Sequence, residues 1–219
     1  MIPEIDSVGA AIVKGVCNPE AKDLAIDLGD FELGALLNEG VLQEIPGIKI
    51  VIAVRKTWTA IHDQLFLRKV AGFLAACPRF TAAEKETFVR EHLSDAKKAK
   101  NLGEAIVLIL DKLDDLEKPE ILAKFFAAFV RGEINLETFR RLAAATDIGF
   151  LEDLKTFAQI SNFADERLKP LYSNLVRTGL VNLEGPNVPG EGGMAKIRYE
   201  VNGLGQLFKN YINKPSAQT

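Results

Sequence analysis

The chain has 219 residues, of which 47% are hydrophobic, so it can bury a substantial core as one large domain or two small ones. Its net charge of −3 excludes a global basic field that would draw the whole protein to nucleic acid, so any such binding must be local. Only two cysteines occur, Cys17 and Cys77, and they predict free buried thiols rather than a disulfide framework. The N-terminus lacks a basic segment ahead of an apolar core, so the sequence predicts no secretory signal and a cytoplasmic location.

The stretch Ile45–Cys77 predicts one long helix. Pro46 suits the first turn of a helix, and no further proline occurs before Pro78, which can end it. Apolar residues three and four apart over Val51–Leu65 form a single stripe at the helical period. A helix of about 30 residues is about 45 Å long. We therefore expect it to be a central element against which shorter helices pack.

Basic residues outnumber acidic ones in this helix, in which Asp63 is the only acid. A basic amphipathic helix can bind a membrane surface or an acidic partner. The favoured interpretation is a central core helix with a solvated basic face, because its apolar content is rich enough to be buried from several sides. No charge-free run approaches the roughly 20 residues of a membrane span. The side chains that would form the membrane or acidic-partner face are Lys49, Arg55, Lys56, His62 and Lys69.

Helix-start signals predict several shorter helices in the first 148 residues. Thr81–Glu84 fits a capping box, and Ser94 can cap the helix after it. The stretch Ala105–Leu110 is apolar on every face, so we expect other elements to surround it. Pro119 and Asn135 mark the starts of two further helices. Residues 1–148 are thus predicted to form an all-α domain.

After residue 148 the pattern changes to helices that flank two strands. Helical segments are predicted over Phe150–Ser161 and Arg167–Thr178. Leu180–Glu184 and Lys196–Val201 then alternate as strands do, and a loop rich in glycine and proline joins them as in a β-hairpin. Asn202–Gly205 leads into a final helix. The predicted fold class is mainly α, with a two-stranded hairpin near the C-terminus.

The run LYSNLVRTGLVNLEG…KIRYEVNGLGQLFKNYI resembles the end of a winged-helix domain. In that fold a helix ends in Gly-Leu-Val, two strands form a wing, and a closing helix begins near a glycine. The resemblance implies a winged-helix-like module over residues 149–212. The polar composition of residues 213–219 separately predicts a disordered tail. The segments IPGIK and TAIHDQLFLRKVAGFL are similar to uncharacterised helical proteins of bacteria and their prophages, and this second resemblance implies no activity.

The sequence lacks the patterns that common enzyme chemistries require. Neither His62 nor His92 has a cysteine or histidine at metal-ligand spacing. No Gly-x-Ser-x-Gly or phosphate-binding Gly-rich motif is present, and the acidic run over residues 111–120 lacks EF-hand spacing. We therefore expect a non-enzymatic protein, with no cofactor, no metal and no small-molecule substrate implied.

Three binding functions remain. The first is a protein-interaction or regulatory module, of which self-association is one form. The second is a winged-helix DNA-binding regulator that places the helix before the wing in the major groove. Against it, residues 150–219 carry eight basic and seven acidic side chains, a net charge of +1. The third is association with a membrane surface through the basic helix. The DNA-binding side chains, with Tyr172 among those expected to face outward, would be Lys169, Tyr172, Ser173, Asn174, Arg177, Lys196 and Arg198.

Overall fold

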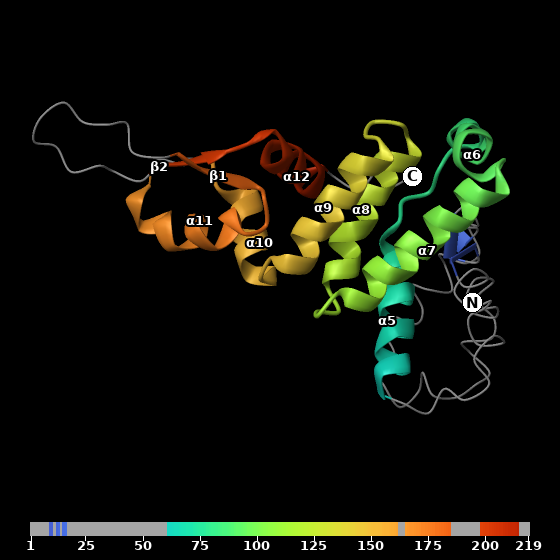
Figure 1. Ribbon diagram of the computed structural model, residues 1–219, viewed down its shortest axis with the longest axis horizontal. Coiled ribbons are helices and arrows are strands. Elements are labelled where there is room, and N and C mark those ends of the chain that lie inside the picture. The colour runs from blue at the N-terminus through green and yellow to red at the C-terminus, as the bar shows by residue number, and fades with distance from the viewer. Residues whose placement is uncertain are drawn as a thin grey trace, which may run out of the picture. The chain divides into compact units, whose positions relative to one another are not determined.

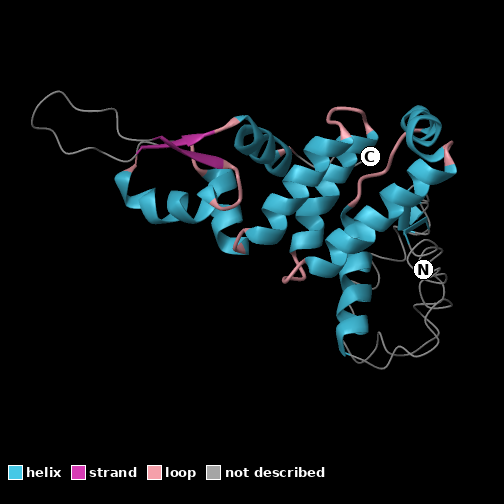
Figure 2. Ribbon diagram, viewed as in Figure 1, coloured by secondary structure: helices cyan, strands magenta, loops and turns pink. Residues whose placement is uncertain are grey.

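The computed structural model is mainly helical with one small antiparallel sheet, which confirms the predicted mainly-α class (Figures 1 and 2). Its described residues group into two compact units, one up to Asn135 and one from Leu136 onward. The domain boundary after residue 148 and the winged-helix identity of the C-terminal part stay predictions. The structure describes residues 9–10, 12–13, 15–16, 61–161, 165–184 and 198–214.

The first unit is built from helices. Within it α5 packs against α8 and α7, and α6 packs against α8. Residues 45–60 of the predicted long helix lie outside the described residues, and the described remainder forms α5. That helix ends at Ala76, one residue before the predicted end at Cys77 and just ahead of Pro78. The helices are α5 (Ile61–Ala76), α6 (Ala82–Phe88), the π-helix η1 (Val89–Leu93), α7 (Ala96–Lys112) and α8 (Lys118–Val130).

Side-chain caps define two helix starts in this unit. The capping box is confirmed: the Glu84 backbone N–H donates to Thr81 Oγ1 at 3.2 Å, and the Thr81 N–H donates to Glu84 Oε2 at 2.7 Å. The prediction that Ser94 caps α7 is wrong by one residue. Because η1 carries the helical backbone through Ser94 (φ −69°, ψ −29°), the first extended residue is Asp95, whose carboxylate accepts from the Lys98 N–H at 2.8 Å.

Phenylalanines of three helices form the centre of this core. Phe73 and Phe126 meet edge to face at 5.4 Å between ring centroids, and Phe88 contacts both Phe126 and Phe129. The expectation that Ala105–Leu110 is surrounded on every face is wrong, because Leu108 is exposed. At 100° per residue, the buried stripe of α7 leaves Leu108 on the opposite side.

The described residues near the N-terminus are helical and pack closely on α7. Ile12 and Val13 are buried, and Gly9 lies against Gly103. A Cβ atom built on Gly103 would come within 2.7 Å of the carbonyl carbon of Gly9. Only a residue without a side chain fits there, so the two glycines set how closely the backbones approach.

The second unit places helices before and after a two-stranded sheet, which Figure 2 shows in magenta. The strands are antiparallel, with Val181 opposite Val201 and Glu184 opposite Arg198, which confirms the predicted strand pair. Asn213, assigned by sequence to the tail, is instead the last residue of α12. The elements are α9 (Leu136–Ile148), α10 (Leu151–Gln159), the 3-10 helix η2 (Glu166–Leu168), α11 (Lys169–Val176), β1 (Val181–Glu184), β2 (Arg198–Val201) and α12 (Gly203–Asn213).

The start of α12 is locked against the start of β1. Asn202 caps α12 by accepting from the Gly205 N–H at 3.0 Å, and its amide donates to the Gly179 carbonyl at 2.8 Å. Gly179 has a φ of +74°, which only glycine adopts without strain. A Cβ atom on Gly205 would lie 2.2 Å from the Leu180 carbonyl oxygen. The segment Val-Asn-Gly-Leu-Gly is therefore the place where the backbone at the start of α12 crosses close to the backbone before β1.

Candidate interaction surface

The residues predicted to contact DNA do not form one exposed surface. Ser173 is exposed on α11, Arg177 is exposed at its C-cap, and Arg198 is exposed on β2. Asn174 is also exposed, but its amide is already bound to a carboxylate of α10. Lys196 lies outside the described residues. Of the predicted set of seven, only Ser173, Arg177 and Arg198 are thus exposed and without a hydrogen-bond or ion-pair partner in the part of the chain that the structure describes.

Tyr172 does not face outward, so that prediction is wrong. The side chain is only 2% exposed, and its ring centroid lies 5.8 Å from that of Tyr199 on β2. Burial raises the pKa of the Tyr172 hydroxyl. The strands cover the face of α11 that carries Tyr172 and Leu175, which leaves Leu171 only half-buried. The helical pattern alone placed Tyr172 on the exposed face of α11, because that pattern does not show which face the strands cover.

Neighbouring carboxylates partly neutralise the basic residues at the start of α11. Lys169 Nζ lies 3.0 Å from Glu166 Oε1. The Arg167 guanidinium forks onto the carboxylate of Asp165 with contacts of 2.8 to 3.2 Å. These pairings reduce the positive charge available to phosphates, which supply most of the affinity of DNA-binding proteins.

One described member of the predicted basic face is buried. Lys69 is 9% exposed, and its ammonium donates to the Asp111 carbonyl oxygen at 2.9 Å, at the end of α7. Lys49, Arg55 and Lys56, and the side chain of His62, lie outside the described residues. Across the described part of the chain, no helix has the length and apolar content needed to cross a bilayer.

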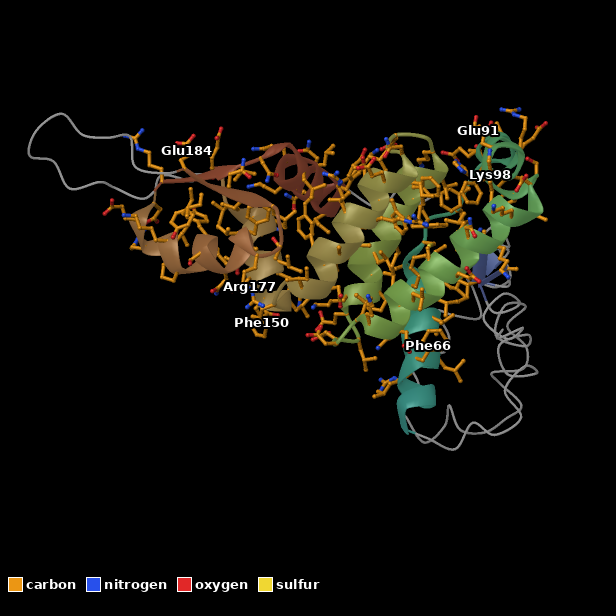
Figure 3. All side chains as sticks on the ribbon, viewed as in Figure 1. Phe66, Glu91, Lys98, Phe150, Arg177 and Glu184 are labelled. Atoms are coloured by element: carbon orange, nitrogen blue, oxygen red, sulfur yellow. The ribbon has the colours of Figure 1, made fainter. Side chains whose placement is uncertain are left out.

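The His92 side chain of the first unit packs against aromatic side chains. Its ring packs at 4.6 Å from the ring of Phe129 and 5.3 Å from that of Phe88. Burial is the main cause that lowers the pKa of His92; Glu91 raises it and Lys98 lowers it further. Figure 3 shows Glu91 and Lys98 near each other on the neighbouring helices. No cluster of three potential metal ligands occurs among the described residues.

A rigid corner between α9 and α10 exposes two large apolar side chains. Ile148 is 53% exposed and Phe150 is 69% exposed. Gly149 between them is buried, and a Cβ atom there would lie 2.6 Å from Leu154 Cδ2. The Gly149 N–H donates to Ala145 and the Leu154 N–H donates to Phe150, each at 3.0 Å. These bonds order the backbone from which both apolar side chains project.

Two opposite charges flank this corner. The Asn174 amide donates to Asp153 Oδ2 at 3.0 Å, which fixes the end of α11 beside the first turn of α10. Arg177 follows three residues later as the C-cap of α11, and Figure 3 shows it at the same end of the unit as Phe150. Neither Arg177 nor Asp153 forms an ion pair with any part of the chain that the structure describes. We call Ile148, Phe150, Asp153 and Arg177 the corner surface.

Sequence reasoning missed Ile148 and Phe150 because each lies in a segment that looks like ordinary helix packing. A signal was nevertheless present. In α9 the buried stripe runs through Phe139, Leu142 and Thr146, and at helical spacing it leaves Ile148 on the other side. Phe150 stands at the N-cap of α10, a position that favours small polar residues rather than an aromatic one.

The chain shows no significant match to any protein-family model, to any curated protein or to any solved structure.

Proposed function

We propose that this chain is a non-enzymatic protein-interaction module that binds a partner through the corner surface. The observation that carries the proposal is Phe150, a large aromatic side chain held in solvent by a rigid backbone. Isolated exposed apolar residues are common on protein surfaces. Here two of them flank one buried glycine beside an arginine, and aromatic residues and arginine are the types most enriched in protein interfaces.

The N-cap position of Phe150 strengthens this proposal. Serine, threonine, aspartate and asparagine are preferred at N-caps, because their side chains accept a hydrogen bond from the first turn. Phe150 has the extended backbone of an N-cap (φ −67°, ψ 132°) but makes no such bond. A phenylalanine there contributes little to folding while it exposes apolar area. Binding gives a reason for its presence that stability does not.

The order of elements in the second unit is compatible with this function. Helices α9, α10 and α11 precede the strands, and α12 follows them, an order that resembles a winged-helix domain. Many such domains bind proteins rather than nucleic acid. The ion pairs of Lys169 and Arg167 favour the protein-binding alternative for this chain.

Site-specific photo-crosslinking in the cells that express the protein tests the proposal. A photoreactive amino acid replaces Phe150 in one variant and Gln206, which is exposed on α12 of the same unit, in the matched control. We expect a discrete covalent adduct from position 150 and none from position 206. No adduct at either position, or equal labelling at both, would refute the proposed surface.

DNA binding is the second candidate, and one observation favours it. Arg177 on the helix before the strands and Arg198 on β2 are both exposed and form no ion pair with described residues. Fluorescence anisotropy with a random-sequence duplex at about 50 mM salt tests it, since phosphate contacts are strongest there. Replacing both arginines by alanine should reduce the salt slope by about 2 if each contacts a phosphate. Absence of binding by the unaltered protein excludes this candidate.

A further inference from the structure

We infer that the partner of the corner surface is a second copy of this chain, bound across a two-fold axis. This inference rests on the proposed function and names its partner. The axis would pass close to Phe150, so that Phe150 and Ile148 of the two copies pack against each other. In a two-fold interface every contact between two different residues occurs twice: residue i of one copy contacts residue j of the other, and j of the first contacts i of the second. A surface suited to this arrangement needs an apolar centre with opposite charges beside it.

The charges of the corner surface meet that requirement. Asp153 is half-buried and bonded to the Asn174 amide, with no cation beside it among the described residues. Arg177 has no anion beside it in the same part of the chain, although it belongs to the same corner. A two-fold axis that passes midway between these two side chains, beside Phe150, would bring Arg177 of each copy to Asp153 of the other. Two ion pairs would then form around one apolar contact.

The balance of charge favours a copy of the chain over a strongly acidic or strongly basic partner. Arg177 and Asp153 contribute one charge of each sign. The neighbouring Glu152 lies 3.1 Å from Lys155 Nζ and so adds no net charge. A partner of a single sign would meet one attractive and one repulsive side chain here, whereas a second copy satisfies both. Electrostatic complementarity of this kind sets orientation and suppresses other partners.

Sedimentation velocity of the purified full-length protein over a concentration series tests self-association. We expect a concentration-dependent dimer with a dissociation constant on the order of micromolar, as befits one aromatic anchor and two charge pairs. Phe150→Ser should weaken the dimer at least tenfold. Leu183→Ser is the matched control, because Leu183 is a similarly exposed apolar residue of the same unit (54%) that lies on β1. Its dimer should be unchanged.

Charge exchange between copies tests the two-fold geometry. Arg177→Glu and Asp153→Arg, each alone, should weaken association about tenfold, because each places like charges together twice. An equimolar mixture of the two variants should recover it. The carboxylate introduced at position 177 of one copy then faces the guanidinium introduced at position 153 of the other, and the native Arg177 and Asp153 meet across the same interface. An ion pair within a single chain could not be restored by mixing. Asp153→Asn keeps the acceptor for Asn174 and removes only the charge, so it separates lost charge from lost folding.

The outcomes distinguish this inference from the proposed function. A protein that stays monomeric throughout the series, or a mixture that associates no better than its components, overturns the two-fold dimer. A crosslink from position 150 to a different protein in cells, together with a monomer in solution, would leave the interaction module standing and replace the partner. Loss of both the crosslink and the dimer would overturn both.

Discussion

Gly205→Ala should disrupt the second unit, because the added methyl group has no space. The Cβ atom would lie 2.2 Å from the Leu180 carbonyl oxygen and 2.8 Å from Val201 Cγ1. The nearest atom belongs to the backbone and cannot rotate away, so α12 must move off the start of β1. Overpacking that displaces backbone costs about 1 to 3 kcal/mol and occasionally more. We expect the upper end of that range, since the shift would also strain the Asn202 hydrogen bonds.

Gly203→Ala provides a control two residues away on the same helix. No atom lies within 4 Å of a Cβ built there, so only helix propensity changes. Alanine is more favourable than glycine in a helix by up to about 1 kcal/mol, and by less in the first turn. Gly203→Ala should therefore leave stability unchanged or raise it slightly. The contrast between the two variants isolates the close crossing from any general effect of adding a methyl group.

Urea unfolding followed by NMR of labelled tyrosines measures this effect in the right unit. All three tyrosines of the chain, Tyr172, Tyr199 and Tyr211, belong to the second unit. Their signals therefore report that unit without interference from the first. A free energy of unfolding for Gly205→Ala within about 0.5 kcal/mol of the unaltered protein would show that the crossing is looser than these distances require.

Three further changes test the first unit. Gly103→Ala should cost about 1 to 3 kcal/mol in urea unfolding because its Cβ meets the Gly9 backbone, whereas Gly72→Ala, whose nearest neighbour lies at 3.8 Å, should not destabilise. Thr81→Ala should cost about 1 kcal/mol by the same measurement, through loss of the capping box. The pKa of His92 is lowered from 6.5 in the folded protein, so stability should fall as pH drops below about 6.5 and level off below the folded pKa. His92→Phe should flatten this part of the melting-temperature profile, and an unchanged slope would contradict the role given to His92.

Local signals predicted element types and several helix boundaries well. The capping box at Thr81, the end of α5 before Pro78 and the two alternating strand segments depend on neighbouring residues alone, and all three are confirmed. The shift of the α7 cap from Ser94 to Asp95 has a different origin. It follows from a π-helix, which inserts one residue into the helical backbone and leaves little trace in apolar spacing.

The orientation of helix faces was harder to predict, because it depends on elements distant in the sequence. Tyr172 is buried because β2 covers it, and Leu108 is exposed because α7 packs from one side only. Lys69 was expected on a solvated face, but its ammonium instead satisfies a carbonyl oxygen at the end of α7, 42 residues away. Composition and periodicity indicate how wide the apolar stripe of a helix is. They do not indicate which other helix or strand packs against that stripe.

The corner surface shows how stability and function can be separated in this chain. Gly149 is required by packing, because Leu154 fills the space that its side chain would occupy. Phe150 is not required by packing: it is exposed, and it stands at an N-cap that serine would fill better by about 1 kcal/mol. At protein concentrations well below the dissociation constant of the dimer, Phe150→Ser should therefore raise the melting temperature. At higher concentrations the same variant loses the stabilisation that association gives. Stability given up in this way is found at binding and catalytic positions, although stabilising substitutions are also common elsewhere. The exposed apolar side chain of Phe150 is then explained by the partner surface that it contacts. The backbone around Gly149 sets the position from which Phe150 projects.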